Sequence, residues 1–238
     1  MNANVKQYIE ENIELIDNDE FDELYRHCPK SYTHHLTFAL QQSGIQPELF
    51  MTKLPFCFMF GNPLIERFVV PSNIEVVENN AFESSHIKTI VFDTNSSVRT
   101  LETCCFAHSK VEYIQWPSAL YMINTECFKS CWELKQLTLP DGLFTIGVQA
   151  FADCRNLIKV TIPASVNMIG AGAFHYCSKL TTVVFEKGSQ AKIGIGAFGS
   201  TDQDSFAAHH PDLTIMCYKD DPVTENLIKL GYKVSVIG

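Results

Sequence analysis

The sequence lacks the features that would direct a chain into a membrane or out of the cell. Its first residues, MNANVKQYIEENIELID, form an acidic helical pattern without the apolar segment of a signal peptide. No uninterrupted apolar run approaches the ~20 residues that a membrane-spanning helix needs. The nine cysteines are accompanied by no export signal, so we expect reduced thiols and not a disulfide framework. These absences together predict a cytoplasmic protein.

Positive charge is also scarce. The chain has 18 lysines and arginines against 27 aspartates and glutamates, and its formal net charge is −9. Residues 1–50 alone contain nine acidic and three basic residues. An acidic chain is poorly suited to the phosphates of nucleic acid and to anionic lipid. We therefore expect a protein partner, best matched by a basic surface, and neither nucleic acid nor a membrane.

Motifs that carry catalysis or hold metals are missing as well. The sequence contains no G-x-S-x-G, no P-loop, no G-x-G-x-x-G after a strand and no H-E-x-x-H. His27, Cys28, His34 and His35 lie close in sequence, but no acid or second cysteine completes a plausible ligand set. The sequence thus predicts a protein that is not an enzyme and has no cofactor or metal.

What the sequence does contain is a repeat of about 23 residues. The residue before each repeated phenylalanine is small, and the residue five positions before it is aliphatic. The residue three positions after it is small and weakly polar. The phenylalanines are spaced by 24, 22, 23, 23 and 24 residues and are Phe82, Phe106, Phe128, Phe151, Phe174 and Phe198. Four positions that stay in step over six units indicate a stack of similar structural units.

Each phenylalanine is followed by an apolar-x-x-apolar-x-apolar pattern, as in Leu157/Val160/Ile162. After Phe82 and Phe106 this pattern begins one residue earlier, and Ile65/Phe68/Val70 shows it upstream as a partial first coil. The alternation predicts a strand. A turn, a second short extended or helical segment and the phenylalanine would then lead to the next strand. Stacked coils bury a continuous core that a single coil cannot bury, and the open ends of the stack need covering.

Small residues recur at fixed places in the coil. Cys131, Cys154 and Cys177 share one column, and we interpret them as buried structural thiols in preference to a metal ladder or redox pair. The glycines before the phenylalanines are explained by tight coil geometry and not by phosphate binding; they are Gly147, Gly170, Gly172, Gly194 and Gly196.

Two units, TIGVQAFADCRNLIKVTIPASV and MIGAGAFHYCSKLTTVVFEKGS, resemble the BspA-like leucine-rich repeat family. That family has an I-G-x-x-A-F core, a cysteine at the third position after the phenylalanine, and then L-x-x-[IV]-x-[IL]-P. The resemblance covers about residues 64–237. It implies a right-handed solenoid with one strand-rich face, found in bacterial surface proteins, protists and some bacteriophages, and generally linked to binding.

The predicted fold is therefore a repeat solenoid of the leucine-rich repeat type, an α/β architecture with a strand-rich face and a cap at each end. Residues 1–50 are predicted to form an acidic helical cap, with helices from Val5 to Ile16, from Phe21 to Cys28, and from Pro29 to Gly44. Residues 51–217 would form about six coils of 22–24 residues plus the partial first coil, with the apolar segment 51–60 as the seam. Residues 218–238 would form a cap of one helix and one strand.

Three surfaces are candidates for binding. Outward positions of the strands form two columns, in which the specific contacts would come from Arg67, Tyr113, Gln115, Gln136 and Lys159. The alternative is that these positions simply suit a half-exposed strand. The second candidate is the acidic cap, with Glu10, Glu14, Glu20 and Glu23, which is otherwise a solvated helical face. The third is the polar insertion at residues 199–212.

These observations favour a non-enzymatic protein–protein interaction scaffold that acts inside a cell. One alternative is a phage-encoded or effector-type inhibitor that binds a host protein. Another is a homo-oligomeric or virion-associated structural protein joined through solenoid faces or ends.

Overall fold

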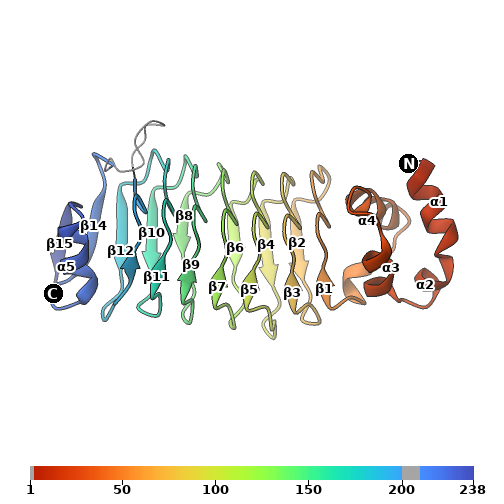
Figure 1. Ribbon diagram of the computed structural model, residues 1–238, viewed down its shortest axis with the longest axis horizontal. Coiled ribbons are helices and arrows are strands. Elements are labelled where there is room, and N and C mark those ends of the chain that lie inside the picture. The colour runs from red at the N-terminus through yellow and green to blue at the C-terminus, as the bar shows by residue number, and fades with distance from the viewer. Residues whose placement is uncertain (1–2, 200–209) are drawn as a thin grey trace.

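The computed structural model describes residues 3–199 and 210–238. The chain forms an elongated parallel solenoid, with four helices at its N-terminal end and one helix with a final strand at its C-terminal end (Figure 1). Within the described ranges, no helix is both long enough and apolar enough to cross a bilayer. The repeat solenoid that the sequence predicts is confirmed.

The strand-rich face contains the longer strands of each coil, and all of its pairs are parallel. Among the described residues it consists of two sheets instead of one continuous sheet. The first sheet contains β2 (Arg67–Val70), β4 (Thr89–Phe92) and β6 (Tyr113–Gln115). The second contains β8 (Gln136–Thr138), β10 (Lys159–Ile162), β12 (Thr182–Phe185), β14 (Thr214–Tyr218) and β15 (Val234–Ile237).

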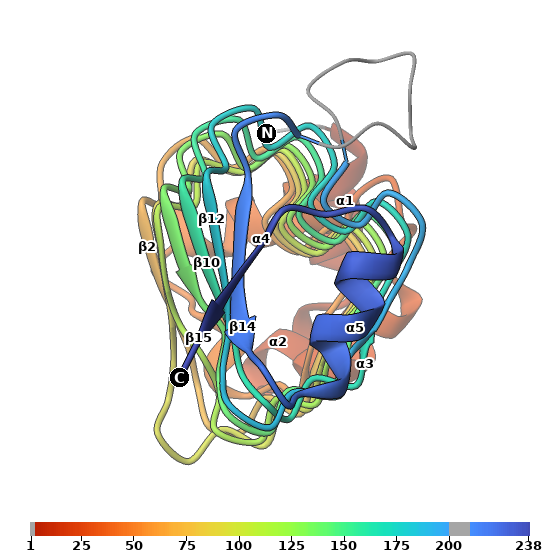
Figure 2. The ribbon, with the colours of Figure 1, turned by 90° about the vertical axis from the view of Figure 1, so that its left-hand side faces the viewer.

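A second ladder runs along another side of the coils. The aliphatic position five residues before each phenylalanine lies in a two-residue parallel strand. Of the two conformations that the sequence allows for this segment, extended or helical, the structure has the extended one. The members are β1 (Lys53–Leu54), β3 (Val76–Val77), β5 (Thr100–Leu101), β7 (Met122–Ile123), β9 (Thr145–Ile146), β11 (Met168–Ile169) and β13 (Lys192–Ile193). Viewed along the stack, the coils lie over one another (Figure 2).

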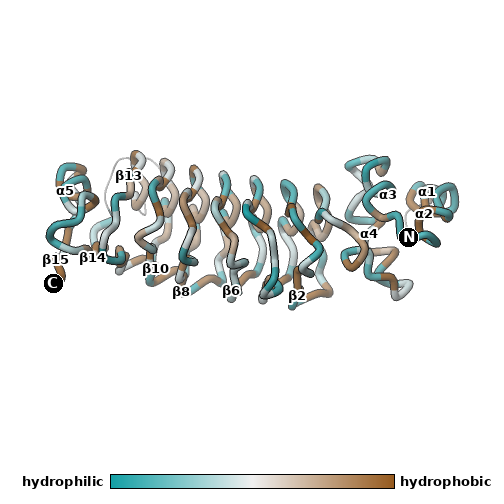
Figure 3. Tube along the Cα trace, turned by 90° about the horizontal axis from the view of Figure 1, so that it is seen from below, coloured by the Kyte–Doolittle hydropathy of each residue, from teal (hydrophilic) through white to brown (hydrophobic). Residues whose placement is uncertain are grey.

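The phenylalanines form a buried column through the solenoid. Neighbouring rings from Phe82 to Phe198 are stacked with centroids 4.9–5.4 Å apart and nearly parallel planes. All six are almost fully buried, and hydrophobic segments recur at corresponding places in successive coils (Figure 3). Burial of such rings, together with their offset stacking, supplies much of the stabilisation of a solenoid core.

The column begins one coil earlier than the sequence pattern indicates. The Met59 N–H donates to the Ala81 carbonyl, just as the Phe82 N–H donates to the Cys105 carbonyl. Met59 therefore occupies the phenylalanine position of a coil that contains β1, with Leu54 five residues before it. The apolar segment 51–60 is thus not only a seam between helices and solenoid but also the first part of the stack. Met51, Leu54, Phe58 and Met59 are buried in the common core.

The coil turns require special backbone geometry on both sides of the column. Residues two positions before and two positions after it have positive φ, as at Gln149 (52°) and Asp153 (59°) around Phe151. Gly172 and Gly196 are at the earlier of these positions. Gly170 has a different role, because a Cβ there would lie 2.5 Å from the Val148 nitrogen of the preceding coil. The interpretation of the glycines as a consequence of tight coil geometry is confirmed.

The N-terminal cap contains α1 (Ala3–Glu11), α2 (Ile13–Asp17), α3 (Phe21–His27), α4 (Thr33–Gln42) and the short 3₁₀ helix η1 (Pro47–Leu49). The predicted first helix is broken at Asn12, whose side-chain amide donates to the Tyr8 carbonyl and competes with helical hydrogen bonding. The predicted third helix begins at Thr33 and not at Pro29, since Pro29–Tyr32 closes as a separate turn. It ends near Gly44, whose φ of 81° is the left-handed conformation expected after a helix.

The C-terminal cap contains α5 (Pro222–Lys229) and β15, which pairs with β14. The Asp221 carboxylate accepts hydrogen bonds from the backbone N–H groups of Gly188 and Ser189, at 2.9 and 3.3 Å. This contact attaches the start of α5 to the last coils. The predicted terminal helix and strand are both present.

Candidate binding surface

The outward residues of the strand face are aligned by the strand register. Arg67 lies opposite Thr89, which lies opposite Tyr113; Gln136 lies opposite Lys159. Arg67, Tyr113, Gln136 and Lys159 are exposed, with an exposed fraction of 57% for Tyr113, whereas Thr89 is half-buried. The predicted outward orientation is therefore correct, although the row is interrupted between Tyr113 and Gln136 because β6 and β8 are not paired.

The split lies where the coil length changes. Val111 follows Phe106 by five residues, whereas Leu134 follows Phe128 by six. Trp116 occupies the third inward position of its coil, and its indole N–H donates to the Thr138 carbonyl at 2.9 Å. That carbonyl belongs to β8, the strand across the split. The result is a cleft of about 250 Å³ whose lining includes Tyr113, Ile114, Trp116, Leu134 and Gln136.

Gln115 is positioned differently from the other strand-face candidates. Its side-chain amide donates to the Phe92 carbonyl of the neighbouring strand at 3.3 Å. Its amide nitrogen is thus already engaged within the protein, while Tyr113 and Gln136 line the cleft. Gln115 supports the arrangement of the strands beside the cleft.

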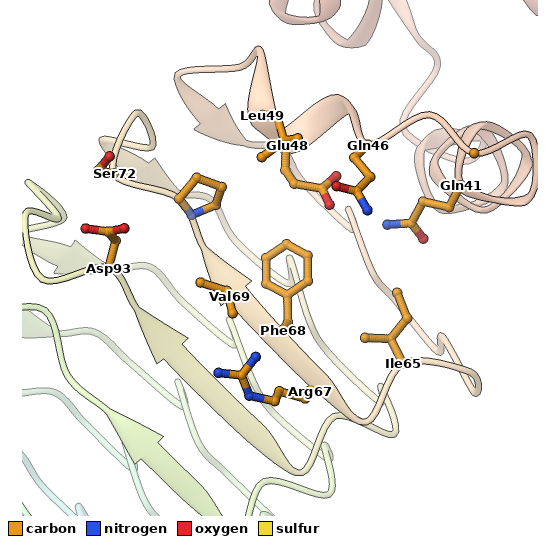
Figure 4. A pocket seen from close by; sticks show the side chains of 12 residues that line it. Gln41, Gln46, Glu48, Leu49, Ile65, Arg67, Phe68, Val69, Ser72 and Asp93 are labelled. Atoms are coloured by element: carbon orange, nitrogen blue, oxygen red, sulfur yellow. The ribbon is translucent and has the colours of Figure 1, made fainter.

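A larger groove lies at the N-terminal edge of the same face, beside β2. Its volume is about 660 Å³. Arg67, Phe68 and Val69 line it from β2, while Gln41, Gln46 and Glu48 line it from the cap (Figure 4). Of the described strands, only β4 pairs with β2, so the other edge of β2 faces this groove. The groove therefore combines an open strand edge with polar side chains.

Glu48 is the unusual residue of this groove. It lies in η1 with an exposed fraction of only 8%, and its carboxylate is directed into the groove (Figure 4). Its backbone carbonyl accepts a hydrogen bond from the Asn73 side chain, but Oε2 has no hydrogen-bond partner within the described part of the chain. Burial away from water raises the pKa of the Glu48 carboxyl. A buried carboxylate oxygen of this kind is costly unless a proton or a donor reaches it.

The charge pattern of the sequence does not distinguish Glu48 from the other acidic residues of the cap. The available signal was its surroundings, PELF, in which one acid is enclosed by proline and large apolar residues just before the seam. Such a carboxyl is more prone to burial than an acid on an amphipathic helix.

The helices around the acidic-cap candidates, α1, α2 and α3, lie at the N-terminal end of the molecule (Figure 1), and none of the four residues lines either cleft of the strand face. Glu10, Glu14 and Glu20 are exposed. Glu23 is paired with Arg26 and with His27, and the hydrogen bond from His27 is the main cause that lowers the pKa of Glu23. The structure therefore does not bring these residues together with Arg67 or Tyr113, and part of their charge is compensated locally.

The cysteine column is structural. The thiols of Cys131, Cys154 and Cys177 donate to the carbonyls of Phe106, Phe128 and Phe151 at 3.1–3.2 Å. Burial raises the pKa of Cys131 and of Cys154 well above the usual range. Among the residues that the structure describes, no group of three or more histidine, cysteine or acidic side chains is arranged to hold a metal.

The late insertion lies mostly outside the described residues, which resume at His210. The His210 side chain is buried, and its Nε2 lies 3.2 Å from the Ser178 carbonyl. His210 thus anchors the chain to the preceding coil. The candidate binding role of residues 199–212 stays a prediction.

Comparison with known proteins found similar solved structures and a matching family. A leucine-rich cell surface protein from Faecalibacterium prausnitzii is 27% identical, with 51% of this chain and 32% of that chain covered and a TM-score of 0.49. A leucine-rich repeat protein from T. pallidum is 24% identical, with 73% and 91% covered and a TM-score of 0.45. The chain thus spans about a third of the first relative. No curated protein matches the sequence. The family model described as BspA type leucine rich repeat region matches residues 8–111, 55–181 and 99–215, so this chain belongs to the BspA-type leucine-rich repeat family.

Proposed function

We propose that this chain is a non-enzymatic protein-interaction scaffold whose strand face contacts the partner. Proteins of the leucine-rich repeat family are generally scaffolds of this kind. The observation that carries the proposal is a set of exposed residues on the strand face: register aligns Arg67 with Tyr113 on the first sheet and Gln136 with Lys159 on the second. Arg67 lines one cleft of this face, and Tyr113 and Gln136 line the other. Tyrosine and arginine often provide the dominant contacts of interfaces, especially beside a pocket that excludes water.

The proposal includes action in a reducing compartment inside a cell. All nine cysteines are free thiols, and seven of them are buried. Proteins of oxidising compartments commonly pair their cysteines, whereas cytoplasmic proteins keep them reduced. The excess of acidic residues supports a partner with a basic surface.

The experiment compares partner capture by the wild-type chain with capture by Tyr113→Ala. Loss of a tyrosine at the centre of an interface typically weakens binding by about thirtyfold or more. Tyr121→Ala is the matched control, because Tyr121 is also an exposed tyrosine but stacks on Phe144 outside the strand face. We expect Tyr113→Ala to lose the captured protein and Tyr121→Ala to retain it. Equal capture by both variants would contradict a role for the strand face.

A homo-oligomer is the second candidate, since β2 and β15 are terminal strands of their sheets and strand edges can join copies. Light scattering at micromolar concentration separates the two: a stable monomer excludes joining through these edges. The phage-encoded or effector-type inhibitor remains a narrower form of the scaffold hypothesis. A gene neighbourhood without phage or mobile-element genes would contradict that form.

A further inference from the structure

The groove beside β2 lies where the strand face is missing one strand. The coil that contains β1 and Met59 contributes a short strand to the second ladder but none to the strand face. On the strand face, residues from the end of α4 and the following turn border the groove instead, namely Gln41, Gly44 and Gln46. The backbone of this turn is satisfied within the cap, because Gly44 N–H donates to Gln41 and Ile45 N–H donates to Leu40. The cap therefore borders the groove without pairing with β2.

The exposed edge of β2 has the properties of a strand-addition site. The strand alternates regularly, with Arg67 and Val69 outward and Phe68 and Val70 buried. Its four residues would span about 13 Å at the usual rise of a strand. An open strand edge offers backbone N–H and C=O groups that an extended peptide can pair with, while side-chain pockets provide selectivity.

Glu48 indicates which side chain such a peptide would carry. Oε2 of this residue is buried and, in the part of the chain described, without a hydrogen-bond partner. Arg67 lines the same groove, but its guanidinium is turned away from Glu48 (Figure 4). No ion pair within the described ranges involves either residue. A buried carboxylate oxygen that lacks a hydrogen-bond donor is stabilised when a cationic donor reaches it.

We propose that the groove beside β2 binds an extended basic segment of the partner protein, which adds a strand to β2 and places a lysine or arginine side chain against Glu48. This inference rests on the proposed scaffold function and names the chemistry of the partner. The net charge of −9 favours the approach of a basic segment over an acidic one. The edge supplies the backbone pairing, and Glu48 supplies the selectivity for charge.

The probe is a fluorescent, end-capped octapeptide of alternating threonine and valine with one central arginine, measured by fluorescence anisotropy against the full chain. A matched peptide has glutamate in place of the arginine. A second matched peptide keeps the arginine but is N-methylated at alternate residues, which removes the backbone donors of one edge. We expect the arginine peptide to bind at least about tenfold more tightly than either matched peptide. The glutamate peptide lacks the charge-assisted hydrogen bond to Glu48, and the N-methylated peptide lacks the backbone hydrogen bonds to β2.

Variants of the protein locate the peptide. Glu48→Gln retains the shape of the side chain and should reduce affinity for the arginine peptide about tenfold. It should not weaken binding of the glutamate peptide, because the substitution removes a like charge. Gln46→Trp should fill the groove and abolish binding, because Gln46 is exposed and lines it. Gln42→Trp is the control, since Gln42 is an exposed residue of α4 outside the groove lining. Circular dichroism establishes that each variant is folded.

Three outcomes would overturn the inference: equal affinity for the arginine and glutamate peptides, binding that N-methylation leaves unchanged, or binding that Gln46→Trp leaves unchanged. Concentration-dependent dimerisation that Gln46→Trp abolishes would assign the groove to a second copy of this chain instead. Partner capture that depends on Tyr113, with no peptide bound at β2, would refute the groove and leave the scaffold function standing. Partner capture that does not depend on Tyr113, together with intact peptide binding at β2, would refute the role of Tyr113 in the scaffold function and leave the groove standing.

Discussion

Glu48→Gln is expected to stabilise the protein in a pH-dependent way. Burial raises the folded-state pKa of Glu48, so in the pH range above its unfolded value of about 4.5 the folded state holds a proton that the unfolded state has released. Wild-type stability therefore falls as pH rises from this value to the folded-state pKa, and above it the full cost of the buried carboxylate is present. Glutamine does not titrate, so the stability of the variant does not fall with pH at this position.

The magnitude follows from the geometry of one carboxylate. A single buried polar atom without a partner costs about 1–3 kcal/mol, and the glutamine amide recovers only part of that because it is also polar. We expect a gain of about 1–2 kcal/mol at pH 8 and nearly none at pH 4. For a chain of 238 residues this corresponds to a rise in Tm of roughly 2–8 °C.

Urea denaturation at several pH values, followed by circular dichroism, measures this difference directly. Glu75→Gln is the control, because Glu75 is exposed and its replacement should change stability by less than about 0.5 kcal/mol at every pH. A Glu48→Gln variant that is no more stable than the wild type at pH 8 would refute the reasoning. A gain in stability together with a loss of peptide affinity would identify Glu48 as a residue retained for binding at the expense of stability.

Two further predictions concern the coil geometry. Gly170→Ala should destabilise the protein by about 2–3 kcal/mol, since its Cβ would meet backbone atoms of the preceding coil. Gly142→Ala should cost about 1 kcal/mol, because a Cβ there has no atom within 4 Å but the φ of 89° is unfavourable for alanine. Urea denaturation compares the two variants, and equal losses of stability would contradict the close approach at Gly170. Phe151→Ala should lower the free energy of unfolding by about 3–5 kcal/mol, because it leaves a cavity between Phe128 and Phe174. Phe144→Ala, at an exposed phenylalanine, is the control and is measured in the same way. An equal or smaller loss of stability for Phe151→Ala would show that the column collapses around the gap.

The repeat made most of the fold predictable. Stacking places similar side chains over one another, so the spacing of the phenylalanines predicts the coils. The apolar alternation after each phenylalanine predicts the strand face, and the shared position of the cysteines predicts their burial. The phenylalanine pattern does not predict the coil of Met59, because methionine replaces the repeated phenylalanine there. The backbone hydrogen bond of Met59 nevertheless matches that of Phe82. A flexible apolar side chain can fill the same space without matching the pattern.

The candidate site was less predictable because it depends on departures from the repeat. The split between β6 and β8 lies where the coil length changes by one residue and where Trp116 contacts β8. Neither the change in length nor the tryptophan is enough, in the sequence alone, to predict that two neighbouring strands do not pair. The groove beside β2 depends on how the turn after α4 packs, which involves no repeated residue. Alternation along the strands predicts the exposure of Arg67 and Tyr113. Only the strand pairing in the structure shows that Tyr113 and Gln136 lie on different sheets.

The column of thiols gives three successive coils a reporter of local opening in each. Cys131, Cys154 and Cys177 are buried in successive coils, each held by a hydrogen bond to the coil before it. An alkylating reagent reacts with the thiolate, which burial disfavours, so each cysteine is labelled only when its own coil separates from its neighbour. Labelling rates resolved by mass spectrometry would rank the coils in order of opening. A native chain without any introduced probe can therefore show whether, of these three coils, the one beside the split in the strand face opens before the two that follow it.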